Sequence, residues 1–133
     1  MSKEETASRQ KFLIKRQSKQ RVIMQYSFDI AVAKRYGADG ATILSNLRYW
    51  ILHNKANRKN FHEGKYWTFN TNKTFSELFP WLSSKQIWLI LDKLEKDSII
   101  EKGNFNSRKY DRTTWYTMTL KGEMLFSDYQ EKL

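Results

Sequence analysis

The stretch IIEKGNFNSRKYDRTTWYTMT, residues 99–119, has the pattern of a β-hairpin. Residues 99–102 begin with two β-branched isoleucines, which favour a first strand. Residues 114–119 alternate in character and predict a returning strand, with a long polar turn at residues 103–112 between the two. The turn carries three cationic side chains. These residues therefore predict a hairpin with a basic tip.

An amphipathic helix is expected directly before this hairpin. Ser83 or Ser84 is a suitable N-cap, and the pattern predicts a helix that runs to about Asp97. Its apolar stripe at helical spacing is Ile87, Ile90, Leu91 and Leu94. The opposite side consists of Lys85, Leu89, Asp92, Lys93 and Lys96, with Trp88 at the border.

Two shorter elements are expected upstream of this helix. Residues 65–69 combine aromatic and β-branched side chains and predict a strand, which follows a polar, basic loop at residues 55–65. Asn72 is a suitable N-cap for a short helix through Phe79. Pro80, the only proline in the chain, ends that helix.

The N-terminal half predicts two helices separated by a glycine. A short helix runs from about Asp29 to Tyr36, and Gly37 is placed at its C-terminal cap. Asp39 is a suitable cap for a longer helix to about Ala56. The apolar stripe of the longer helix is Ile43, Leu47, Trp50, Ile51 and Asn54, with Leu44 at its edge.

The 133-residue chain is strongly basic, with 24 Lys and Arg against 14 Asp and Glu and a formal net charge of +10. Such an excess attracts polyanions, so nucleic acid is the first partner to consider. The absence of cysteine excludes disulfides, thiolate nucleophiles and zinc sites built on sulfur. No apolar stretch has the length of a membrane span, and no apolar signal core follows the N-terminus. We therefore expect a cytoplasmic protein of a bacterial or phage-infected cell, without membrane contact.

The order of the expected elements is that of a winged helix. We predict an α+β, mainly helical fold with a helix-turn-helix, a β-hairpin wing, and extra N- and C-terminal helices, the last at residues 121–133. Residues 1–25 are expected to form a basic N-terminal arm, and residues 26–133 the winged-helix domain.

This fold predicts where DNA is bound. The second helix of a helix-turn-helix enters the major groove, and the hairpin tip follows the backbone or the minor groove. Cations of the tip suit phosphate contacts, although Asp111 and Arg112 are equally able to pair with each other and shape the hairpin. The predicted DNA-binding residues are Lys73, then Lys85, Gln86, Trp88, Leu89 and Lys93 of the helix, and Asn106, Ser107, Arg108, Lys109 and Arg112 of the turn.

The aromatic residues have a different expected role. Trp88 and Leu89 are large apolar side chains outside the core stripe, so their expected exposure to solvent requires an explanation. The sequence leaves three interpretations open: these side chains contact thymine methyl groups, pack on the N-terminal arm, or form a dimer surface. Core and hairpin packing is expected, in place of base stacking, for Trp50, Trp67, Trp81 and Trp115.

Several segments together resemble a known family. They are residues 34–37 (KRYG) with 41–50, 65–70 (KYWTFN), 78–83 (LFPWLS), 103–106 (GNFN) and 109–116 (KYDRTTWY). They resemble the N-terminal winged-helix domain of phage and prophage replication-initiation proteins, replisome organisers related in architecture to the DnaD-like primosome proteins. The resemblance covers about residues 28–120 and is most specific in the hairpin. It implies binding to a replication origin in double-stranded DNA, commonly at repeated sites and often as a homodimer or higher oligomer.

The chain departs from this family in two ways. Family members often carry basic or polar residues at the positions of Trp88 and Leu89. Many also continue into a C-terminal region that engages the helicase or its loader, whereas this sequence ends at Leu133. We therefore carry over the binding of DNA and not a loading role.

Catalysis is not expected. His53 and His62 match no standard metal-site spacing, even with Glu63 beside the second histidine. The five glycines form no phosphate-binding loop, and no serine lies in a nucleophile-elbow context. The sequence predicts no enzyme, no cofactor and no metal.

Two other functions remain open. A winged helix can also serve as a protein-interaction module, with Trp81, Trp88 and Leu89 as anchors for a replisome, host or phage protein. A transcriptional regulator shares the fold and differs in the DNA site that it occupies. DNA binding is expected to weaken steeply with salt, whereas an apolar protein interface is not.

Overall fold

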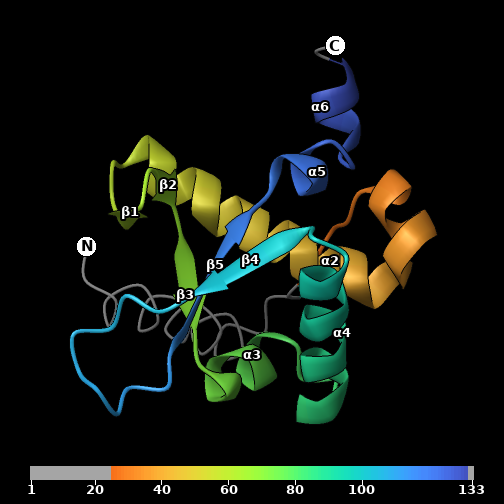
Figure 1. Cartoon of the computed structure of the whole chain (residues 1–133). Helices are drawn as coiled ribbons and strands as arrows, with labels where there is room; N and C mark the ends of the chain where they lie inside the picture. Colours follow the sequence, from red (N-terminus) through yellow and green to blue (C-terminus); the bar gives the residue numbers. More distant parts are fainter. Residues whose placement is uncertain (1–24, 132–133) are drawn as a thin grey trace.

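The computed structural model describes residues 25–131, which form an α+β fold with one long helix and two small antiparallel sheets (Figure 1). The expected α+β class is confirmed. The predicted arm, residues 1–25, lies outside the described residues except for Gln25. The elements are α2 (Ile30–Ala56), β1 (Phe61–His62), β2 (Lys65–Tyr66), β3 (Thr68–Asn70), α3 (Asn72–Leu78), α4 (Ser84–Lys96), β4 (Ile100–Gly103), β5 (Thr114–Met118), α5 (Leu120–Glu123) and α6 (Ser127–Glu131).

Helix α2 is interrupted at Gly37. It begins after Asp29, whose carboxylate accepts hydrogen bonds from two backbone N–H groups of the first turn. Gly37 has φ 75° and ψ 169°, a conformation that glycine adopts without the clash of a Cβ atom. The two helices expected from the sequence are therefore the two segments on either side of this bend. Asp39, the expected second cap, accepts a hydrogen bond from Trp81 Nε1 at 2.9 Å.

Both predicted apolar stripes pack into the core. In the longer segment of α2, Leu44 is fully buried together with the expected stripe, whereas Trp50 is only partly buried. In α4 the stripe contributes three buried side chains, and Ile90 is partly buried against the same core. Core packing is confirmed for Trp67 and Trp115, which are 3% and 4% exposed.

A small hairpin, β1–β2, replaces part of the loop expected at residues 55–65, so that prediction is wrong. Phe61 pairs with Tyr66, and His62 pairs with Lys65. The two residues between the strands both have positive φ, 52° at Glu63 and 75° at Gly64. Two successive positive φ values characterise the tight turn whose twist matches that of a hairpin.

A three-stranded antiparallel sheet, in the order β3-β5-β4, forms the centre of the fold. One face carries Tyr116 and Ile100, which pack against α2, α3 and α4 in the main core. The other face carries Phe69 and Trp115, paired across the sheet and packed with Trp67 in a second cluster. The sheet therefore separates a helical core from a small aromatic cluster at the base of the hairpin.

The N-caps of α3 and α4 come from hydroxyl side chains. Thr71, and not the predicted Asn72, caps α3, because its Oγ1 accepts from the N–H of Thr74 at 3.1 Å. Ser83 caps α4 as predicted. Its hydroxyl accepts from the N–H of Gln86, and the Gln86 side chain accepts from the N–H of Ser83, which completes a capping box.

The C-terminal segment forms two short helices, α5 and α6, and not the single helix predicted at residues 121–133, of which 132–133 lie outside the described residues. Phe126, between the two helices, is buried under the guanidinium of Arg48, 4.2 Å from the ring centroid. Arg48 also forms ion pairs with Glu123 and Asp128 at 2.9 and 3.2 Å. Burial of Phe126 and these ion pairs favour the turn over a continuous helix.

Candidate nucleic-acid interface

The hairpin loop, residues 104–113 between β4 and β5, extends past the ends of these strands and away from α5 and α6 (Figure 1). Asn106 organises it from within. The Asn106 Nδ2 donates to the carbonyls of Asp111 and Thr113 at 3.1 and 2.7 Å, and Oδ1 accepts from Trp115 Nε1 at 2.7 Å. Asp111 accepts from the N–H of Thr113 at 2.9 Å. Side-chain hydrogen bonds therefore give this long loop a defined shape.

This geometry changes the expected role of Asn106. Both amide hydrogens donate to carbonyls of the loop, so the side chain acts as an internal brace and not as a donor to a phosphate. Asp111 has a role in the loop as well, because its carboxylate holds the backbone of Thr113. The sequence signal for both roles is weak, since asparagine and aspartate are common in any turn.

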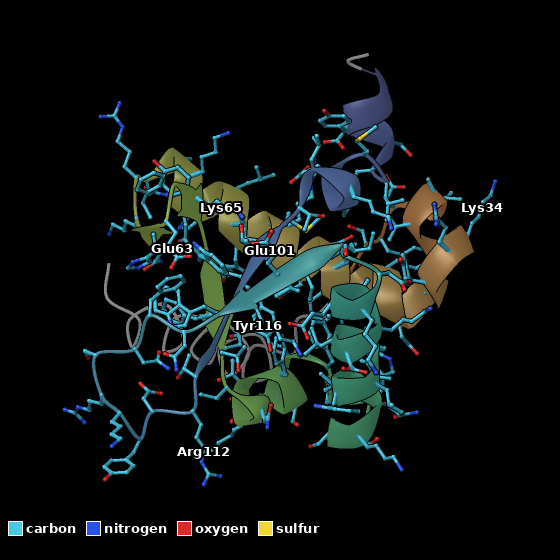
Figure 2. The ribbon with its side chains drawn as sticks, in the orientation of Figure 1. Lys34, Glu63, Lys65, Glu101, Arg112 and Tyr116 are labelled. Atoms are coloured by element: carbon cyan, nitrogen blue, oxygen red, sulfur yellow. The ribbon has the colours of Figure 1, made fainter. Side chains whose placement is uncertain are left out.

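The cations of the hairpin loop face solvent. Arg108, Lys109 and Arg112 are all exposed, as is Ser107. Figure 2 shows Arg112 pointing outward from the lower end of the fold. Within residues 25–131 no ion pair involves any of the three cations. Their charges are therefore available to an anionic partner.

Tyr110, beside these cations, is 88% exposed, the largest exposed fraction among the exposed large apolar residues of the described chain. Tyr110 is not among the DNA-binding residues predicted from the sequence. The sequence feature that indicates such a role is its position in the middle of a basic turn, because an aromatic side chain there has no core to pack into.

The base of the hairpin loop is held by stacked rings. The ring of Phe105 lies 4.4 Å from that of His62 of β1, with an interplanar angle of 5°, and it also contacts Trp67. Trp67 Nε1 in turn donates to the carbonyl of His62 at 2.9 Å. The β1–β2 hairpin thus supports the loop, and His62, which matches no metal-site spacing, is part of this support.

Helix α4 presents fewer uncompensated charges than the loop. Lys93 pairs with Asp97 at 3.3 Å, and Lys96 pairs with Asp92 at 2.9 Å. Lys85, in the first turn, is exposed, as is Lys73 in α3. The capping box uses the Oε1 of Gln86, another predicted DNA contact. The N-terminal turn of α4 is therefore its most cationic surface within the described chain.

Asp97 also links α4 to the start of α2. The Tyr36 hydroxyl donates to its carboxylate at 2.9 Å. This hydrogen bond is the main cause that lowers the pKa of Asp97 below its ordinary value of 3.8, and Lys93 adds to the effect. Partial burial, followed by the hydrogen bond to Asp97, raises the pKa of Tyr36 to about 12. The hydroxyl therefore remains a donor at neutral pH.

A pocket of about 210 Å³ lies between α3, α4 and the β4–β5 hairpin. Trp88, 56% exposed, is on its α4 side, and Lys102, Thr114 and Tyr116 are on its sheet side. Lys102 is paired with Glu95 of α4 at 3.4 Å. Figure 2 shows Tyr116 in the region between the sheet and these two helices. Burial raises the pKa of the Tyr116 hydroxyl to about 12, so it is neutral at physiological pH.

The structure divides the predicted site residues into separate groups. Trp88 borders the pocket beside the hairpin, whereas Leu89 lines a different, apolar hollow of about 170 Å³ with Tyr36 and Ile90. Trp81 is 52% exposed, so its predicted core position is wrong. Its ring lies against those of Tyr26 and Phe79. In the same turn before α4, the Phe79 carbonyl accepts a hydrogen bond from the N–H of Leu82 at 3.0 Å. Trp88 and Leu89 therefore do not line one common hollow.

No family model, curated protein or solved structure matches the chain. Among residues 25–131, no helix has both the length and the apolar composition needed to cross a membrane. No group of three or more His, Asp or Glu side chains suited to a metal ion occurs in the same residues.

Proposed function

We propose that this protein is a winged-helix DNA-binding protein that binds duplex DNA without catalysing a reaction. In this interpretation α3 and α4 are the helix-turn-helix, and the hairpin loop between β4 and β5 is the wing. The order of helices and strands and the β3-β5-β4 sheet support the proposal. The turn of residues 79–83, between the two helices, is short and contains Pro80.

The observation that carries the proposal is the braced, basic hairpin loop. Three exposed cations lie on a loop whose shape is fixed by Asn106 and by the ring of Phe105. A preorganised loop loses little conformational freedom on binding, so its charges contribute more to affinity than those of a mobile segment. Phosphate contacts of this kind set position and salt dependence.

Helix α4 is the proposed element for the major groove. Lys85 and the exposed part of Gln86 belong to its first turn, where recognition helices contact base edges. Lys93 and Lys96 are compensated by aspartates of the same helix and are expected to contribute less. From the resemblance of its sequence segments to replication initiators, we propose that the DNA site is at a replication origin of a phage or mobile element.

The test is a double substitution in the loop. Replacement of Arg108 and Lys109 by alanine is expected to weaken binding to all duplex sequences about equally. It should reduce the slope of log K against log salt by roughly two, because each phosphate contact contributes about 0.9 to that slope. The measurement is fluorescence anisotropy with labelled duplexes over a series of salt concentrations.

The matched control replaces Lys34 and Arg35 by alanine. This pair is also adjacent, exposed and doubly charged, but it belongs to the start of α2 (Figure 2). The control should change the salt slope by much less. Equal salt slopes for the loop variant and the wild-type protein would show that the hairpin loop is not part of the DNA interface.

A protein-interaction module is the second candidate. The observation in its favour is the exposure of Trp81, Trp88 and Leu89, at 52%, 56% and 48%. Large exposed apolar groups are characteristic of protein interfaces. Binding of a protein partner through them would persist at high salt, whereas duplex binding through the loop would not.

A further inference from the structure

We infer that the pocket between α4 and the β4–β5 hairpin takes one unpaired base of single-stranded DNA, stacked on Trp88. The inference rests on the proposed function in one respect, that the ligand is DNA. It adds a second activity, because a duplex does not present an unpaired base.

The size of the pocket limits its occupant. A volume of about 210 Å³ is below the range of roughly 300–1,000 Å³ that is usual for drug-sized ligands. A single flat ring matches this size better than an extended peptide or a cofactor.

The walls have the two kinds of surface that a base requires. Trp88 and Leu91 supply an apolar side, and about half of the Trp88 side chain is open to solvent. Stacking on an exposed indole is favourable for every base, because each has a π-face. Thr114 and Tyr116 supply hydroxyl groups on the opposite side.

A buried amide lies next to this polar side. Asn70 pairs with Thr114 across the sheet, so its side chain is on the same face of the sheet as that of Thr114. Asn70 is 2% exposed, and within residues 25–131 neither its Oδ1 nor its Nδ2 has a hydrogen-bond partner. A buried amide of this kind is unfavourable until a polar group satisfies it.

The distribution of charge favours nucleic acid over a protein side chain as the occupant. Inside the pocket, Lys102 is compensated by Glu95, so the pocket suits a neutral ring. Three exposed cations without an ion pair in the described residues, Arg108, Lys109 and Arg112, lie on the hairpin loop that joins the same two strands. Phosphates of a strand that places one base on Trp88 are therefore expected near these cations.

The test compares two labelled oligonucleotides of equal length and charge. One is oligothymidine, and the other is the same sugar-phosphate chain without bases. The full-length wild-type protein should bind oligothymidine at least about five-fold more tightly, since stacking of one base on an aromatic side chain gives a gain of that order. Trp88→Ala should abolish this preference and leave the affinity for the abasic chain unchanged.

Two further variants keep the test decisive. Trp81→Ala removes a tryptophan of similar exposure outside the pocket and should retain the preference. Trp88→Phe, which keeps an aromatic ring, should retain part of the preference for oligothymidine over the abasic chain. Thermal unfolding of each variant shows that the fold is intact.

Equal binding of both oligonucleotides by the wild-type protein, or a preference that persists in Trp88→Ala, overturns the inference. A pocket that receives an aromatic side chain of a partner protein would give the first of these results. The proposed function is tested separately with blunt duplexes. Duplex binding without a base preference refutes only the inference, and a base preference without duplex binding refutes only the proposed function.

Discussion

At the scale of single residues, the hydrogen bond from Tyr36 to Asp97 shows how one contact links distant parts of the chain. Tyr36 lies just before the bend of α2, and Asp97 is the C-cap of α4. The same carboxylate pairs with Lys93, so one acidic side chain both holds the end of α4 and compensates a lysine on its outer side. The orientation of the proposed recognition helix therefore depends in part on this contact.

Replacement of Tyr36 by phenylalanine is predicted to raise the pKa of Asp97 toward 3.8, because the hydrogen bond from Tyr36 is the main cause of its lowered value. A lowered pKa in the folded state contributes stability above the unfolded value, and that contribution is lost as pH falls through the folded value. The wild-type protein should therefore lose more stability than the variant below about pH 4. NMR titration of the Asp97 carboxyl measures the shift.

Tyr49→Phe is the control for this substitution, since Tyr49 is an exposed tyrosine of the same helix. It should leave the titration of Asp97 unchanged. The same Asp97 pKa in Tyr36→Phe and in the wild-type protein would contradict the assigned cause.

At the scale of elements, the hairpin loop is held by side chains and not by strand pairing. Asn106 contacts three positions of the loop and of β5, and Phe105 stacks on the β1–β2 hairpin. The loop and the small hairpin should therefore behave as one structural unit.

Asn106→Ala is predicted to loosen this unit. The substitution leaves the Trp115 indole N–H and the Thr113 carbonyl without their partner, which costs about 1–3 kcal/mol of stability. Urea unfolding measures the free energy, and hydrogen exchange of the loop measures the local effect. Duplex affinity should also fall, although the net charge is unchanged.

Ser107→Ala, an exposed position in the same loop, is the matched control and should have little effect on stability. Wild-type stability and wild-type exchange in Asn106→Ala would contradict the role of Asn106 as a brace.

Much of this element structure follows from local sequence. The alternation of residues 114–119 predicts the returning strand, and the stripe of α4 is predicted by helical spacing. The β1–β2 hairpin was not predicted, although Gly64 at its turn was a signal, because each strand has only two residues. The break between α5 and α6 depends on Phe126 and Arg48, which are distant in sequence and meet only in the folded chain.

The candidate site was predicted less completely than the fold. Exposure of Arg108 and Lys109 follows from their place in a polar turn, and this much was predicted. The inward direction of Asn106 was not, because its side-chain partners, Asp111, Thr113 and Trp115, lie further along the chain and meet it only when the loop folds back. The pocket beside Trp88 requires the packing of two helices against a sheet, and no local pattern encodes such a cavity.

At the scale of the whole molecule, charge is unevenly distributed. Seven of the 24 Lys and Arg residues and two of the 14 acidic residues occur in the first 24 positions, so this segment carries half of the net charge of +10. In the described residues, Lys93 and Lys96 of α4 are compensated, whereas Lys85 and the three cations of the hairpin loop form no ion pair. A strong, salt-dependent attraction to polyanions is the expected consequence.

The most direct test of duplex binding is an anisotropy titration of the wild-type protein at two salt concentrations. It compares a duplex of random sequence with a duplex from the DNA around the gene that encodes the protein. We predict tighter binding to the native DNA and a steep loss of affinity for both duplexes at the higher salt concentration. No binding to either duplex at low salt would contradict the central claim that this protein binds DNA through its braced, basic hairpin loop.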